Sequence, residues 1–216
     1  MGIFYFPCNF VYWRNLENHD SLKKFIKELL DNNPELLKRH DLVKNGLSTF
    51  TKEKTGCFYE EFKNHELIKT VIWDTIDQLL DTLNSRENTE KIEIKGSIIN
   101  SYWFSVYDAN STVRCHNHCD RGRPVSYVGG ETFYGAISLI YIVSDENEKN
   151  QTVFLQPSSS GVNAHEFLEN IFDTSFIDEI GEGTVLVFPS NLHHEVTTIV
   201  KPGRIIFSAN ISFSHV

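Results

Sequence analysis

The chain has 216 residues, of which 40% are hydrophobic and 23% charged, and its formal net charge is −9 at pH 7. This composition predicts an ordinary folded protein with one sizeable core and excludes a disordered acidic chain. The acidic balance also disfavours nucleic acid as a partner, because most of the surface would repel phosphate groups.

The N-terminal segment is apolar, but it has neither the positive charge nor the cleavage site of a signal peptide. No apolar run approaches the roughly 20 residues that a membrane helix needs. The four cysteines are too few and too irregularly spaced for a disulfide framework. We therefore expect a cytoplasmic protein with no membrane partner.

Two amphipathic helices are predicted in the first half. Asp20 is placed to cap a helix that ends before Pro34. Asn64 is placed to cap a longer helix, in which apolar residues recur at helical spacing from Leu67 to Leu83. A short helical stretch is expected over residues 34–43. These apolar stripes are core faces, and we assign them no chemistry.

From about Lys95 the chain is rich in β-branched and aromatic residues, which favours strands. The predicted strands lie near residues 96–107, 113–119, 136–143, 152–156, 184–188 and 204–213. Helices followed by antiparallel strands predict an α+β fold whose sheets form a sandwich or jelly roll. We expect a single domain over 1–216, with 1–94 as a mainly helical support and 95–216 as the β core.

Residues 115–120 gather side chains that bind metals. In an extended strand His116, His118 and Asp120 share one face, and a distant strand has to supply a further ligand, for which His194 or His193 is placed. Three protein ligands on one side of an ion suit Fe(II) with O2 and a chelating co-substrate. The acidic ligand is then Asp120, or His118 takes the place of the acid and the site contains three histidines.

A structural zinc site is the alternative interpretation of the same segment. Its ligands would be Cys115, His116, His118 and Cys119. Strand parity disfavours this site, because both cysteines face away from the imidazoles in a regular strand. A tight loop would remove that objection.

Several short segments follow one another in a specific order. They are the aromatic strand at 101–107, the H-x-H motif at 116–118, the strands at 138–142 and 153–157, the F-P-S motif at 188–190 leading to His194-Glu195-Val196, and Arg204 with Asn210 six residues later. Their order and spacing resemble the 2-oxoglutarate/Fe(II)-dependent oxygenases of phages and marine bacteria, an H-x-H branch of the prolyl-hydroxylase-like superfamily. The N-terminal half is similar as well, at 3–7 and 46–49, so the resemblance covers nearly the whole chain.

The resemblance implies a double-stranded β-helix, or jelly roll, with N-terminal helices packed on one sheet. In this superfamily the first histidine follows a strand tyrosine by nine residues and the acid follows it by eleven. Counted from Tyr107, these positions are His116 and His118. The resemblance thus favours His116, His118 and His194 as metal ligands. Asp120 is the alternative to His116 if the register shifts by two residues, or else a neighbour of the ligands.

The resemblance also implies a co-substrate site. Arg204 follows His194 by ten residues, the offset at which this superfamily places the base that holds the distal carboxylate of 2-oxoglutarate. A guanidinium suits this role because it pairs with a carboxylate through two charge-assisted hydrogen bonds. Strand parity puts Arg204, Ser208 and Asn210 on one face of the last strand, opposite an apolar face. The candidate residues of the pocket wall are Tyr107, Tyr141, Ser208 and Asn210.

The expected activity couples the oxidative decarboxylation of 2-oxoglutarate at Fe(II) to the oxidation, most commonly hydroxylation, of a small-molecule or peptide substrate. One alternative is a three-histidine metal dioxygenase that does not use 2-oxoglutarate and forms no succinate. Another is a non-catalytic zinc-binding jelly-roll module, which would retain zinc and consume no O2. The sequence names neither the substrate nor the oligomeric state.

Overall fold

The computed structural model describes residues 2–6, 9–50, 65–85, 91–118, 124–147, 151–155, 171–173 and 179–214. Its helical elements are α1 (His19–Asn32), the 3₁₀ turn η1 (Pro34–Leu36), the π-helical segment η2 (Ile68–Trp73) and α3 (Asp74–Asn84). None of the described helices is long and apolar enough to cross a membrane.

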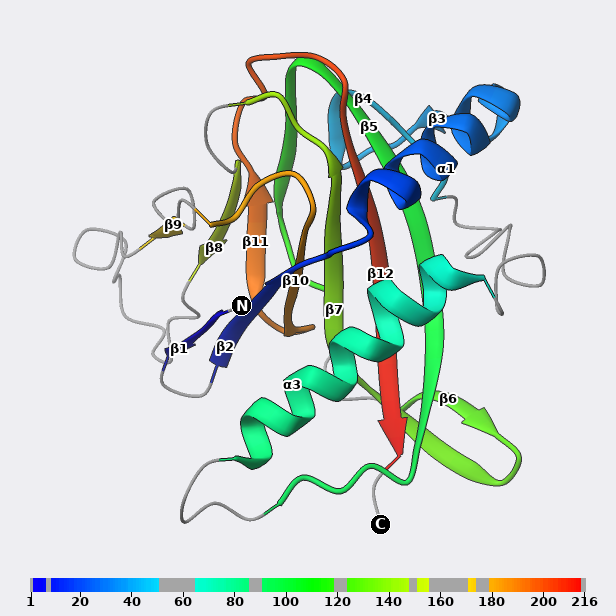
Figure 1. Cartoon of the computed structure of the whole chain (residues 1–216), viewed down its shortest axis with the longest axis vertical. Coiled ribbons are helices and arrows are strands. Elements are labelled where there is room, and N and C mark those ends of the chain that lie inside the picture. The colour runs from blue at the N-terminus through cyan, green and yellow to red at the C-terminus, as the bar shows by residue number, and fades with distance from the viewer. Residues whose placement is uncertain are drawn as a thin grey trace.

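The described strands form one curled, twelve-stranded antiparallel sheet in the order β1-β2-β10-β7-β12-β5-β11-β8-β9, with β3, β4 and β6 branching from this path (Figure 1). The first six are β1 (Gly2–Phe6), β2 (Asn9–Asn15), β3 (Lys38–Arg39), β4 (Val43–Ser48), β5 (Gly96–His116) and β6 (Pro124–Val128). The others are β7 (Glu131–Ser144), β8 (Thr152–Leu155), β9 (Ile171–Asp173), β10 (Thr184–Pro189), β11 (His193–Val196) and β12 (Arg204–Ser214).

The long strand β5 belongs to both layers of the fold. Up to Tyr107 it pairs with β12, and from Val113 to His116 it pairs with β11. Between these parts the chain turns at Asn110, which has φ 64°, and β4 turns beside it at Asn45, with φ 56°. Asparagine tolerates this left-handed region better than most residues do. The turn carries the sheet from one layer to the other, as a jelly roll requires.

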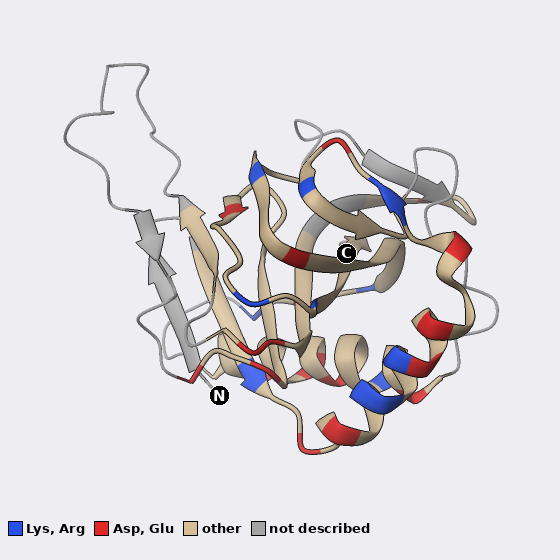
Figure 2. Cartoon of the chain, turned by 90° about the horizontal axis from the view of Figure 1, so that it is seen from above, with Lys and Arg blue, Asp and Glu red and all other residues tan. Residues whose placement is uncertain are grey.

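Successive side chains of the strands point to opposite faces of the sheet and pack into two separate hydrophobic cores. On β12, Phe207 and its odd-numbered neighbours pack with the buried stripes of α1, η2 and α3, which cover the outer face of the β7–β12–β5 layer (Figure 1). Ile206 instead packs between the layers, with Tyr107 and Phe188 among others. Charged residues occur mainly on the helices and loops, and most of the strand ribbon carries none (Figure 2). The space between the layers is therefore the apolar interior in which the site lies.

The fold class is confirmed, and so are both long helices. The strands predicted in the second half are also present as β5, β7, β8, β10 and β12, with the first two predicted strands joined in β5, whereas β6, β9 and β11 were not predicted. Two local predictions are wrong. Helix α1 begins at His19, so Asp20 lies in its first turn and does not cap it. Residues 34–43 form only a 3₁₀ turn before β3 and β4, not a short helix. The first half also supplies strands β1 to β4. The predicted cap Asn64 lies outside the described residues.

Candidate metal centre

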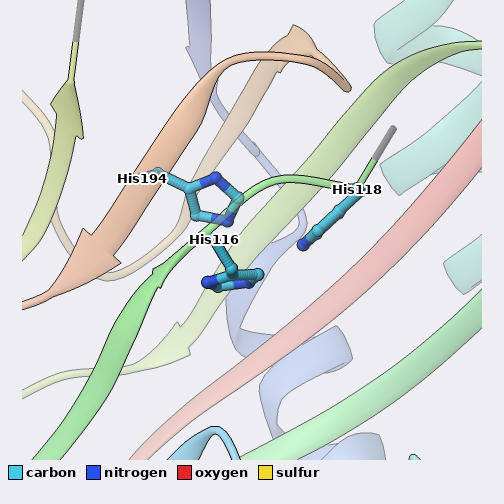
Figure 3. A group of neighbouring side chains, drawn as sticks. All are labelled: His116, His118 and His194. Carbon is cyan, nitrogen blue, oxygen red and sulfur yellow. The ribbon is translucent and has the colours of Figure 1, made fainter. Parts of the chain in front are cut away.

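Three histidines converge between the layers of the sheet (Figure 3). The ligand atoms of His116, His118 and His194 all lie within 4.8 Å of one another. The centroid of the His116 ring lies 5.0 Å from that of His118 and 4.3 Å from that of His194. Antiparallel pairing of β11 with β5 sets His194 opposite His116, so a strand distant in sequence supplies the third imidazole.

Each ring has a hydrogen-bond acceptor at its Nδ1 atom. In His116 the acceptor is the carbonyl of Arg114 at 2.7 Å, and in His194 it is the carbonyl of Leu192 at 3.1 Å. In His118 it is the side-chain oxygen of Asn210 at 2.8 Å. An acceptor at Nδ1 holds the proton on that nitrogen and leaves the lone pair on Nε2, the arrangement that a metal-binding histidine needs.

Burial keeps the three rings neutral. Desolvation, reinforced by His116, lowers the pKa of His118 from 6.5 to about 4. Desolvation also lowers the pKa of His116, and it lowers that of His194 well below the usual value. Neutral imidazoles bind a divalent ion without first losing a proton. Three of them suit iron, zinc, copper or nickel, so the donor set fits an Fe(II) centre.

The remaining candidate ligands fall outside this cluster. His193 is on the opposite face of β11 from His194, and its Nε2 atom lies 3.2 Å from the Asn117 amide. Cys115 is exposed, and it is not part of the one group of potential metal ligands that the described residues form. This placement disfavours the zinc site of cysteines and histidines. Asp120 and Cys119 lie outside the described residues.

A cavity of about 270 Å³ adjoins the three histidines. Strands of both layers contribute apolar side chains to its wall, among them Val113, Ile140 and Ile206. Ser208 and Asn210 add polar groups from β12, as predicted for that face. The cavity therefore places a mostly apolar space next to the metal ligands.

The outer part of the cavity has an aromatic wall, which consists of His40, Phe50 and Trp103. Phe50 packs edge-on against both His40 and Trp103, at centroid distances of 5.3 and 5.1 Å. Trp103 in turn contacts His118 edge-on at 5.6 Å. This wall therefore leads directly to the metal ligands.

Arg204 lies at the start of β12 and does not itself line the cavity. The Arg204 and Asp145 side chains are 0% and 3% exposed, and the Nε atom of Arg204 lies 3.0 Å from an Asp145 oxygen. A second nitrogen of the guanidinium donates to the Thr152 hydroxyl at 3.2 Å. The guanidinium carbon is 6.0 Å from the ring centre of Tyr107, and Tyr107 lines the cavity. The side chain of Tyr107 thus separates the buried Arg204 guanidinium from the cavity.

Tyr141 lies on the opposite face of β7 from the cavity. Its hydroxyl is 2.8 Å from Nδ1 of His19 on α1, and its ring belongs to the outer core. The neighbouring Ile140 lines the cavity in its place. Strand parity explains the difference, because successive side chains of a strand point to opposite faces.

Sequence reasoning missed several residues that shape the site. Ser138 carries a detectable signal, because it is a serine directly between the apolar residues Ile137 and Leu139, and it bonds to His118 at 2.9 Å. Asp145 and Thr152 carry no sequence signal, because only the three-dimensional fold brings them to Arg204. The aromatic wall carries little signal, because Phe50 follows β4 and Trp103 lies on β5, which meet only in the folded sheet.

No protein-family model matches the sequence, and no curated protein is similar to it. Solved structures do match. One is the 2OG complex of the viral collagen prolyl hydroxylase of Paramecium Bursaria Chlorella virus-1, with 12% identity over 93% of this chain and 96% of that chain and a TM-score of 0.51.

HygX from Streptomyces hygroscopicus, with nickel, 2-oxoglutarate and hygromycin B bound, is 14% identical over 94% of this chain and 82% of that chain, with a TM-score of 0.52. OsALKBH1 is 12% identical over all of both chains, with a TM-score of 0.55. At these identities the likeness shows the fold. The chain has the double-stranded β-helix of 2-oxoglutarate oxygenase structures, as the resemblance implies, whereas the H-x-H branch stays a prediction.

Proposed function

We propose that this protein is a non-haem Fe(II) oxygenase that couples the oxidative decarboxylation of 2-oxoglutarate to the oxidation of a second substrate. The observation that carries the proposal is the convergence of His116, His118 and His194, each with Nδ1 bonded to an acceptor, beside a mostly apolar cavity. The donor set fits iron, and the fold is one in which solved relatives bind 2-oxoglutarate.

The three histidines hold the metal through Nε2. The bound iron supplies the activation of O2 and of the keto acid. Arg204 binds the distal carboxylate of 2-oxoglutarate, and Ser208, on the same strand face, lines the cavity. Asp145 supports this role, because its ion pair with Nε orients the guanidinium and offsets part of the cost of its burial.

The substrate is a small molecule or a peptide that binds against the aromatic wall of His40, Phe50 and Trp103. The HygX structure, which has a similar fold, contains bound hygromycin B, and the viral relative is a collagen prolyl hydroxylase. The apolar side chains of the cavity exclude water during the reaction. The chain acts as a single domain over 1–216 in the cytoplasm.

The test is product formation by the Fe(II)-loaded protein in air with 2-oxoglutarate and no other substrate. We expect slow, metal-dependent conversion of 2-oxoglutarate to succinate, and its loss in His194→Ala. Consumption of O2 without succinate would replace the proposal with a three-histidine dioxygenase that does not use 2-oxoglutarate. Tight zinc retention with neither product nor O2 consumption would replace it with a non-catalytic zinc module.

A further inference from the structure

His118 is held differently from the other two histidines. His116 and His194 each donate to a backbone carbonyl two residues earlier, so the strand itself orients them. The Nδ1 atom of His118 meets side chains instead, the Asn210 oxygen at 2.8 Å and the Ser138 hydroxyl at 2.9 Å. His118 follows the end of β5, where a bond from its backbone N–H to the Ser190 carbonyl, at 2.8 Å, fixes only its main chain. The direction of its ring therefore depends on these side chains.

Asn210 lies at the centre of a row of hydroxyl groups. On β12 it stands directly opposite Ser101 of β5 and Ser138 of β7. Its amide nitrogen donates to the Ser101 hydroxyl at 3.1 Å, and its amide oxygen accepts from the Ser138 hydroxyl at 2.9 Å. The Ser190 hydroxyl, 3.1 Å from that of Ser138, extends the row. All three serines are buried.

The row determines which end of the amide faces His118. Because the Asn210 nitrogen is used on the Ser101 side, its oxygen points to the imidazole. An amide oxygen accepts and cannot donate, so the facing Nδ1 of His118 has to carry its proton. The lone pair of His118 then sits on Nε2, directed toward His116 and His194 (Figure 3). A carboxylate at position 118 would have no N–H to give to this oxygen.

We propose that Asn210 is a positioning residue that selects the Nδ1-protonated form of His118 and aims its ring, so that position 118 serves as a third imidazole ligand. The inference rests on the proposed function, since it concerns the same metal site, but it assigns Asn210 to the metal ligand and not to the co-substrate. Ser101 and Ser138 fix the orientation of the Asn210 amide, and this amide fixes the orientation of the His118 ring. The site is thus built for three histidines.

The experiment titrates Co(II) against a competing chelator into metal-free protein, without 2-oxoglutarate. Loss of a residue that orients a metal-binding histidine weakens metal affinity by about 10- to 100-fold, and we expect this for Asn210→Ala. Asn210→Asp should restore most of the affinity, because a carboxylate also accepts from Nδ1. Asn100→Ala is the matched control. It removes a half-buried amide that bonds to Ser212 across the same β5–β12 pair, and it should bind Co(II) like the wild type.

Nitrogen-15 NMR of the histidine rings in metal-free protein is the second measurement. We expect His118 to carry its proton on Nδ1 in the wild type and to lose this preference in Asn210→Ala, which a purely structural role of Asn210 would not produce. Co(II) affinity of Asn210→Ala within twofold of the wild type, or of His118→Ala equal to the wild type, would overturn the inference. A wild type that binds Co(II) tightly but never binds 2-oxoglutarate would overturn the proposed function and leave this inference standing.

Discussion

The three imidazoles of the site differ from ordinary histidines because burial disfavours their charged form. The unfolded chain takes up a proton on each of them near pH 6.5, whereas folded His118 does so only near pH 4. Between these values the unfolded state binds more protons, so the free energy of unfolding falls as the pH falls. The histidines that prepare the site for a metal thereby make the metal-free protein sensitive to acid.

For metal-free protein we predict full stability above about pH 6.5 and a progressive loss down to about pH 4. His118 alone accounts for up to about 3 kcal/mol of this loss. Urea unfolding at a series of pH values measures it. His118→Gln should flatten the profile, whereas His193→Gln, on the same strand as His194 but facing away from the site, should not. If the free energy of unfolding of His118→Gln depends on pH in the same way as that of the wild type, His118 is not the source of the acid sensitivity.

The buried pair of Arg204 and Asp145 gives a second prediction at the residue scale. Asp145→Ala leaves a buried guanidinium without its carboxylate, which costs about 3–5 kcal/mol of stability. Replacing both partners, in Asp145→Ala with Arg204→Met, should recover much of that loss, because no buried charge then remains. Denaturant unfolding of the three proteins tests this, and a loss below 1 kcal/mol in Asp145→Ala would show that the pair is not buried as described.

At the scale of elements, the turn within β5 decides where the H-x-H segment lies. Asn110 is exposed and has φ 64°, a conformation that glycine adopts without strain. We predict that Asn110→Gly is nearly neutral, whereas Asn110→Val costs about 1–2 kcal/mol because its branched side chain disfavours that region. Thermal unfolding measures both variants, and equal melting temperatures for them would argue against a left-handed residue here.

Strand parity gives a prediction for β7. Tyr141→Phe removes the hydrogen bond to His19 and should cost about 1 kcal/mol of stability. Because Tyr141 faces the helices, the affinities for Co(II) and 2-oxoglutarate should stay as in the wild type. Calorimetric titration compares the two proteins. A tenfold weaker binding of 2-oxoglutarate by Tyr141→Phe would return this residue to the co-substrate site.

In the second half, β6, β9 and β11 were not predicted. The other strands of that half, β5, β7, β8, β10 and β12, could be predicted because they are rich in β-branched and aromatic residues. The strands of the first half could not, for two reasons. Val11, Tyr12 and Trp13 on β2 are all buried, so the strand shows no alternation. β4 has the sequence VKNGLS, which has weak strand propensity and is held in place by pairing with β5. Tertiary pairing, not local sequence, determines both strands.

For the whole molecule, the curled sheet is what assembles the site. His116 and His118 were predictable from their spacing, and His194 from its motif, because the chain order of a jelly roll brings these strands together. The partners of Arg204 were not predictable, since Asp145 and Thr152 meet it only in the folded chain. The sequence therefore indicates the candidate metal-binding residues, and the fold brings together the residues that orient them.

The central claim is that 2-oxoglutarate binds between the three histidines and Arg204, and anaerobic titration of the Fe(II)-loaded protein with 2-oxoglutarate tests it most directly. We predict a weak visible charge-transfer band of the metal–keto acid chelate. The band should be absent in His194→Ala, and it should need far more 2-oxoglutarate in the variant that carries both Arg204→Met and Asp145→Ala. No band from a wild type that has bound Fe(II) would contradict the account.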